Sequence, residues 1–126
     1  MKEIIITPNA PDPVGPYNQA VKAGDTLYMS GQIAIDPKTG SLVMDNIENE
    51  THQVFKNLKA VLEKDDMTFE NIVKCTVFVS DMNNYGRINA VYGEYFDDNT
   101  APARELVEVA RLPKDVNIEI SAIAVK

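Results

Sequence analysis

The chain has 126 residues, of which 44% are hydrophobic and 25% are charged, a composition typical of a soluble globular protein with one domain. Twelve basic residues against nineteen acidic ones give a net charge of −7 at neutral pH. A field of that sign repels phosphate backbones and anionic lipids, which argues against nucleic acids and membrane surfaces as partners.

The N-terminal third predicts strands separated by loops. Residues 3–7 include three consecutive isoleucines and a threonine, all β-branched, which favours a short first strand. Four prolines follow within residues 8–16, and because proline has no backbone N–H, we expect a stiff loop there. Residues 18–36 predict two strands that meet in a hairpin at residues 23–26, with a turn at residues 36–40.

The rest of the chain predicts two helices and three strands. From residue 46 to about residue 64 the apolar side chains recur on one helical stripe. A β-branched strand is predicted over residues 71–81, and a second helix over residues 82–96. Two further strands, over residues 103–109 and 116–126, complete the chain.

The order βββαβαββ predicts one α+β domain over residues 1–126, with both helices on one face of a mixed sheet. The last strand is apolar on both sides: Ile118 and Ile120 alternate with a set that includes Ile123 and Val125. A strand buried on both faces needs two covers, and two helices on one face supply one. We therefore expect a second subunit as the other cover, although a central position in the sheet would explain part of the pattern.

The single cysteine and the single histidine carry little chemistry. Cys75 alternates with Val73 and Val77, which favours a core thiol over a nucleophile, and it cannot form an internal disulfide. His52 lies in the first predicted helix without a Cys or His nearby, so an exposed helix position is a better interpretation than a metal site. With no membrane-length apolar run and no signal peptide, we expect a cytoplasmic protein.

Two charged residues interrupt the last predicted strands. Alternation puts Arg104 on the same side as Leu106, with Glu105 opposite, and Glu119 lies within an apolar run. One interpretation is that Arg104 and Glu119 form a structural ion pair on neighbouring strands, or that both face water. The other is that Arg104 binds an anionic ligand through its planar fork, while Glu119, with a pKa raised by apolar surroundings, transfers protons.

Four stretches of the chain carry a resemblance to a known family. The stretches are "GPYNQAV" (15–21), "MSGQIAIDPKTG" (29–40), "VKCTVFVSDMNNYGRINAVYGEYF" (73–96) and "APARELVEVARLPKDVNIEISAIAVK" (101–126). Through these stretches, in order and over nearly its whole length, the chain resembles the RidA (YjgF) family of reactive intermediate deaminases. The resemblance implies a chorismate-mutase-like α+β fold assembled as a homotrimer, with three sites in the clefts between subunits.

The resemblance also implies an activity. Members of the family hydrolyse 2-iminobutanoate and 2-iminopropanoate, which pyridoxal-phosphate enzymes release, to the 2-oxo acids and ammonia, without a cofactor. Arg104, in the "PAR" motif, would bind the substrate carboxylate, and Glu119, in the terminal "IE", would position and activate water. Asn89 of the second predicted helix would also lie in the cleft.

The N-terminal half supplies the remaining implied site residues. Tyr17 of the "GPY" motif would stand at the mouth of the cleft on the stiff proline loop. The "SGQ" segment supplies Ser30, Gly31 and Gln32, and Gly31 would let the backbone approach the ligand closely.

The chain departs from the family pattern directly after its arginine. The family usually has a small residue and then often a cysteine, where this chain has Glu105 and Leu106. The extra negative charge of Glu105 could weaken anion binding, which keeps a non-catalytic regulatory protein that binds 2-oxo acids as an alternative. Retention of Glu119 favours the enzyme. A translation-inhibiting endoribonuclease, also described in the family, is disfavoured by the charge of −7 and the lack of a basic stripe.

Overall fold

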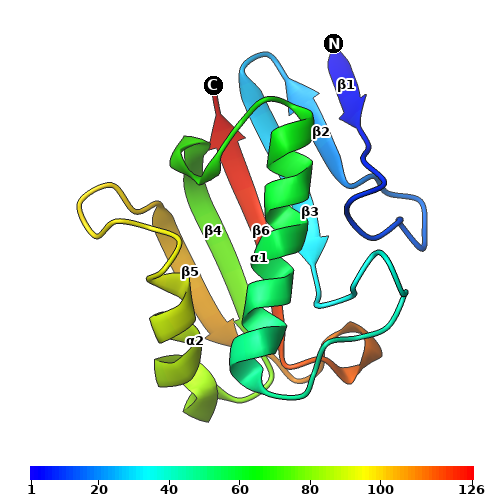
Figure 1. Ribbon diagram of the computed structural model, residues 1–126. Coiled ribbons are helices and arrows are strands. Elements are labelled where there is room, and N and C mark those ends of the chain that lie inside the picture. Colours follow the sequence, from blue (N-terminus) through cyan, green and yellow to red (C-terminus); the bar gives the residue numbers. More distant parts are fainter.

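Both helices lie on the same face of a six-stranded sheet (Figure 1). The computed structural model describes every residue from 1 to 126. The strands run in the order β1-β2-β3-β6-β4-β5, and only the β4–β5 pair is parallel. The predicted element order, the mixed sheet and the helices on one face are confirmed. The bounds are β1 Lys2–Ile5, β2 Ala20–Ala23, β3 Thr26–Gln32, α1 Ile47–Lys64, β4 Ile72–Val79, α2 Tyr85–Tyr92, β5 Ala103–Glu108 and β6 Ile118–Val125.

Helix α1 begins and ends where its sequence signals predict. The side chain of Asn46 accepts a hydrogen bond from the backbone N–H of Asn49 at 2.7 Å, which satisfies one of the free donors of the first turn. Glu48 and Glu50 place negative charge at the positive end of the helix dipole, which is favourable. The apolar stripe packs on the sheet and is buried; it comprises Ile47, Val54, Phe55, Leu58, Val61 and Leu62.

Helix α2 is shorter than the sequence predicts. The predicted helix over residues 82–96 begins as a short 3₁₀ turn and ends as an α-helix at Tyr92, with Gly93 as its C-cap. Glycine is a poor helix former, and the aromatic residues beyond it gain more by packing on α1. Tyr95 stacks on Phe55 with ring centroids 4.2 Å apart.

Strand β6 lies in the middle of the sheet, between β3 and β4. Ile118 and Ile120 are completely buried beneath the helices, whereas Ile123 on the opposite side is only partly buried. The helix-free side of the sheet, called the open face below, carries an apolar row across four strands. The row comprises Ile4, Val21, Tyr28 and Ile123.

The open face remains partly exposed. Tyr28 keeps 51% of its surface exposed and Val107 keeps 44%. The doubly apolar character predicted for the last strand is therefore present, and the chain's own helices cover one side only. Neither helix combines the length and the apolar character needed to cross a bilayer.

Candidate functional site

Arg104 and Glu119 lie on opposite faces of the sheet. On β4, Cys75 pairs with Arg104 of β5, and Phe78 pairs with Glu119 of β6. Residues three apart on a strand point to opposite sides, so Arg104 faces the helices and Glu119 faces the open side. The interpretation of the two residues as a structural ion pair within one chain is wrong. Each lines its own pocket, and the residues around the two pockets are called the Arg104 half-site and the Glu119 half-site below.

A bulge in β3 forms the floor of the Glu119 half-site. Met29 pairs with Ala122 and Gln32 pairs with Ile120, so both Ser30 and Gly31 stand opposite the single residue between those partners. The carboxylate of Glu119 occupies the space above Gly31, because a Cβ built there would stand 2.2 Å from Oε2 of Glu119. Glycine at position 31 thus makes room for the carboxylate.

The carboxylate of Glu119 has neither a hydrogen bond nor an ion pair within the chain. Partial burial raises its pKa above the ordinary value of 4.5, since desolvation disfavours the charged form. A carboxyl group with a raised pKa and free oxygens is suited to take and return a proton.

A buried anchor fixes the beginning of β6. Glu50 of α1 is completely buried, and its carboxylate accepts hydrogen bonds from the backbone N–H and the side-chain amide of Asn117, both at 2.8 Å. The carbonyl oxygen of Asn117 in turn accepts from the backbone N–H of Ser80, at the end of β4. Asn117 precedes Glu119 by two residues, so this network holds the strand that carries the carboxylate.

A pocket of about 400 Å³ opens above Glu119 and Gly31. The proline loop forms one wall with Tyr17, whose hydroxyl accepts a hydrogen bond from the backbone N–H of Val14 at 3.4 Å. Lys114, which adopts a positive φ of 55°, contributes a cationic side chain to the lining. The full lining is Pro11, Asp12, Val14, Tyr17, Gln19, Ser30, Gly31, Gln32, Ile33, Ile35, Pro113, Lys114 and Glu119.

Gln19 holds the proline loop against this pocket. It is only 2% exposed, and both ends of its side chain bond to the loop backbone: its oxygen accepts from the N–H of Thr7, and its two amide hydrogens are shared among the carbonyls of Thr7, Ala10 and Pro11. The backbone carbonyl of Gln19 accepts a hydrogen bond from the backbone N–H of Ser30 at 3.0 Å. The side-chain amide of Gln19 therefore pairs backbone groups of the loop, and its backbone carbonyl joins the loop to the bulge.

The Arg104 half-site lies between β5 and α2. One terminal nitrogen of the guanidinium donates to Oδ1 of Asn89 at 2.8 Å, and the other donates to the hydroxyl of Tyr85 at 3.1 Å. The guanidinium carbon lies 4.7 Å from the ring centre of Tyr92. A second pocket of about 390 Å³ borders this group; its lining is Asn89, Tyr92, Gly93, Phe96, Asp98, Ala101, Pro102 and Arg104.

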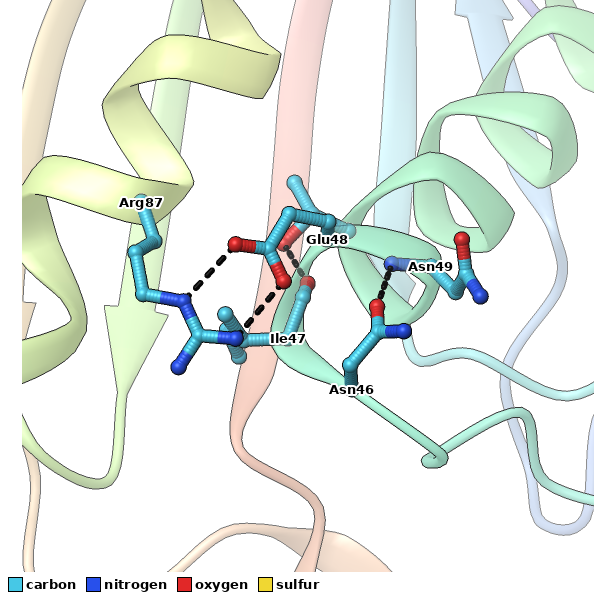
Figure 2. Close-up of polar contacts among 6 residues, drawn as sticks. Asn46, Ile47, Glu48, Asn49 and Arg87 are labelled. Atoms are coloured by element: carbon cyan, nitrogen blue, oxygen red, sulfur yellow. Dashed lines mark hydrogen bonds and ion pairs between the residues drawn. The ribbon is translucent and has the colours of Figure 1, made fainter.

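An ion pair between Arg87 and Glu48 links helix α2 to α1 (Figure 2). Arg87 donates two hydrogen bonds to the carboxylate of Glu48, both at 2.7 Å. This bidentate pair lowers the pKa of Glu48 to about 2. Arg87 lies between Tyr85 and Asn89 on the helix, so the pair holds the segment that presents both partners of Arg104.

The two residues that depart from the family pattern after Arg104 have clear surroundings. Glu105 points to the open face and forms an ion pair with Lys74, which lowers the pKa of Glu105. Its charge is therefore compensated and directed away from the arginine. Leu106 shares the face of Arg104, as predicted, and packs against the hydrophobic core.

The predicted site residues thus fall into two groups. Asn89 joins Arg104, whereas Tyr17, Ser30, Gly31, Gln32 and Glu119 line the other pocket. Gln32 is nearly buried and pairs with Ile120, so it borders that pocket from the helix side.

Sequence reasoning missed three contributors to the half-sites: Tyr85, Tyr92 and Gln19. Tyr85 and Tyr92 share with Asn89 the spacing i, i+4, i+7, which puts all three on one helix face. Because Asn89 was a predicted site residue, this shared face is the sequence signal that could have identified the two tyrosines.

His52 is not simply exposed on its helix. Its Nδ1 lies 2.6 Å from the hydroxyl of Tyr95, and the two side chains are partly buried together. Cys75 is completely buried, as predicted, and burial raises the pKa of its thiol. No group of three or more His, Cys, Asp or Glu side chains is arranged to hold a metal ion.

The chain is similar to known proteins along its whole length. A family model described as endoribonuclease L-PSP matches residues 7–126. A RutC family protein of Pyrococcus horikoshii is 54% identical over 126 residues, with 100% of this chain and 99% of that protein covered. The 2-iminobutanoate/2-iminopropanoate deaminase of Salmonella typhimurium is 48% identical over 128 residues, with 100% and 99% covered. The crystal structure of TdcF from E. coli with bound serine has a TM-score of 0.92 and 41% identity over 98% of each chain.

Proposed function

This chain belongs to the endoribonuclease L-PSP family, the family of RidA and YjgF proteins, and we propose that it is a deaminase of 2-imino acids. Its substrates would be 2-iminobutanoate and 2-iminopropanoate, which water converts to the 2-oxo acids and ammonia. One observation carries the proposal: the chain presents a desolvated, unpaired carboxylate on Glu119 and an arginine, Arg104, that contacts only neutral groups. These are a proton carrier and an anion clamp.

The proposed active unit is a homotrimer, in which one copy supplies the Arg104 half-site and a neighbour supplies the Glu119 half-site. The opposite orientation of the two residues supports this arrangement, because no single copy brings them together. The apolar row on the open face supports it further, since a surface with Tyr28 half exposed gains stability when another subunit covers it.

In the proposed reaction, Arg104 binds the substrate carboxylate and so orients the imine carbon. A water molecule attacks that carbon while Glu119 takes one of its protons. The carboxylic acid then returns the proton to the nitrogen, which gives a tetrahedral intermediate with one hydroxyl and one amino group. Glu119 next takes the hydroxyl proton and passes it to the amino group, so the C=O bond forms as the C–N bond breaks, and ammonia and the 2-oxo acid are released. Tyr17 and the bulge at Ser30 and Gly31 enclose the reacting end of the substrate.

The proposed reaction needs few catalytic groups from the protein. Imines of this kind already hydrolyse in water, so orientation and one proton carrier are sufficient. General acid–base assistance contributes roughly 10²- to 10⁴-fold, and holding the reactants in line contributes more. The reaction requires no covalent nucleophile and no cofactor.

A non-catalytic protein that binds small carboxylic acids is the second candidate. The relative with bound serine favours it, because that ligand also carries a carboxylate. The ion pair between Glu105 and Lys74 removes the main objection to anion binding, and this helps the binder and the enzyme equally. An endoribonuclease activity, as the family description reads, is disfavoured by the net charge of −7.

An assay coupled to threonine dehydratase separates these functions. The dehydratase releases 2-iminobutanoate continuously, and we expect this protein to shorten the lifetime of the imine in proportion to its concentration. A binder would leave the imine lifetime unchanged while still binding 2-oxobutanoate in calorimetry. Light scattering on the same sample should give the mass of a trimer at micromolar concentration, and a monomeric mass would rule out sites shared between copies.

A further inference from the structure

The hydrogen bonds of Arg104 leave most of its donors unused. A guanidinium has five N–H donors, and only two of them are engaged, by Oδ1 of Asn89 and by the hydroxyl of Tyr85. Neither partner is charged. The positive charge of Arg104 is therefore uncompensated by any carboxylate of its own chain.

The hydroxyl hydrogen of Tyr85 makes no hydrogen bond within the chain. Its oxygen accepts from Arg104, so its own hydrogen points elsewhere, and it donates to no other group of the chain. The side chain is 41% exposed, which makes this hydrogen accessible from outside. Asn89 is similar, because its oxygen is engaged by Arg104 while its amide nitrogen donates to no group of the chain.

We propose that Tyr85 is a substrate-binding residue, whose hydroxyl donates a hydrogen bond to the carboxylate held by Arg104. This inference rests on the proposed function and identifies a further part of its anion clamp. An ionised carboxylate only accepts hydrogen bonds and offers about four lone-pair sites. Arg104, Tyr85 and the amide of Asn89 together supply donors from one sheet edge and one helix face, which matches that requirement.

The hydroxyl, rather than the ring, is the part of Tyr85 that matters. The guanidinium carbon of Arg104 lies 5.8 Å from the ring centre of Tyr85 but only 4.7 Å from that of Tyr92. Tyr92 therefore provides the closer cation–π contact. Its own hydroxyl is buried and without a partner in the chain, so it does not serve the exposed side of the guanidinium.

Replacing Tyr85 with Phe removes one hydroxyl and leaves the ring. We expect the affinity for 2-oxobutanoate, measured by calorimetry, to fall roughly ten- to hundredfold, as for the loss of one hydrogen bond to a charged group. In the imine assay, KM should rise by a similar factor while kcat changes little, because the bond is made equally in the ground and transition states. The uncharged analogue 2-oxobutanamide should lose less affinity than 2-oxobutanoate.

Tyr95→Phe is the matched control, since the hydroxyl of Tyr95 contacts His52 and not Arg104. This variant should bind 2-oxobutanoate like the parent. If Tyr85→Phe also bound 2-oxobutanoate with the parent affinity, the proposal would be overturned. The comparison needs no turnover, so it holds even if the parent protein fails to hydrolyse imines, an outcome that would contradict the proposed function alone.

A second variant separates a direct bond from an indirect one. Placing 3-fluorotyrosine at position 85 makes the hydroxyl a stronger donor and a poorer acceptor. If the hydroxyl donates to the ligand, 2-oxobutanoate should bind more tightly at a pH where the phenol is protonated. If Tyr85 only accepts from Arg104 and orients it, the affinity should stay the same or fall, and that result would reject the direct bond.

Discussion

The carboxylate of Glu119 fills the space that a side chain at position 31 would need. A Cβ on Gly31 would stand 2.2 Å from Oε2 and 2.8 Å from the carboxyl carbon of Glu119. Real Cβ atoms do not approach so closely, so any other residue at position 31 must displace the carboxylate. The position of the Glu119 carboxylate therefore requires glycine at position 31.

Gly31→Ala is expected to abolish most imine hydrolysis while leaving the fold intact. The added methyl group moves the Glu119 carboxylate from its position above the bulge, and a small displacement of a catalytic group has a large effect on rate. The measurement is kcat in the coupled imine assay, with circular dichroism to check the fold.

Gly86→Ala is the control for this change, because a Cβ at that position in α2 has no heavy atom within 4 Å other than those of its chain neighbours and the adjacent backbone of its own helix. Alanine also favours the helix, so this variant should be active and no less stable than the parent. Parent-like activity in Gly31→Ala would mean that the position of the Glu119 carboxylate is unimportant.

The pH profile should report the raised pKa of Glu119. A base must be ionised to take a proton, so kcat/KM should fall with decreasing pH through an apparent pKa above 4.5. Because burial favours the neutral acid, the stability that this group contributes is present at low pH and is lost as pH rises through the folded-state pKa. Glu119→Gln should therefore be inactive yet at least as stable as the parent at neutral pH. Lower stability of that variant in urea would contradict the desolvation argument.

The elements could be predicted from sequence because their signals are local. The stripe of α1 and the alternation around Arg104 depend only on nearby residues. The relation between Arg104 and Glu119 could not be predicted in this way. Alternation tells which residues of one strand share a side, but the register of β4 with both neighbours decides which side of the sheet that is.

Local sequence patterns could not predict the bulges in β3 and β4 either. Ser30 and Gly31 form one, and a register shift between Ile72 and Lys74 leaves Val73 exposed although its alternation with Cys75 suggested burial. An extra residue in a strand reverses the alternation on one side of it, and only cross-strand pairing reveals where.

Gln19 should be essential for the order of the proline loop. Gln19→Leu keeps the volume but leaves one N–H and three carbonyls of the loop without partners, which should lower the free energy of unfolding by about 2 kcal/mol or more. Urea unfolding measures the loss. Gln53→Leu, at a buried residue that donates only to Asn57, should cost less; equal losses would show that the loop contacts of Gln19 have no special weight.

The pair between Glu48 and Arg87 should stabilise the protein only slightly, because both side chains are largely exposed. The pKa of Glu48 is lowered from 4.5 to about 2, so its contribution is present above pH 4.5 and is lost as pH falls toward 2. The stability difference between the parent and Glu48→Gln should therefore disappear in acid, and should shrink in high salt at neutral pH. A difference independent of both pH and salt would mean that the pair is not electrostatic.

Mixing two inactive variants tests the central claim that each site combines half-sites from two copies. Arg104→Ala and Glu119→Gln should each be inactive alone. When the two are co-expressed in equal amounts and assemble at random in a cyclic trimer, about a quarter of the sites receive both intact halves. The account predicts about a quarter of the parent imine hydrolysis in the mixture. Activity no higher than that of the separate variants would show that Arg104 and Glu119 do not meet across an interface.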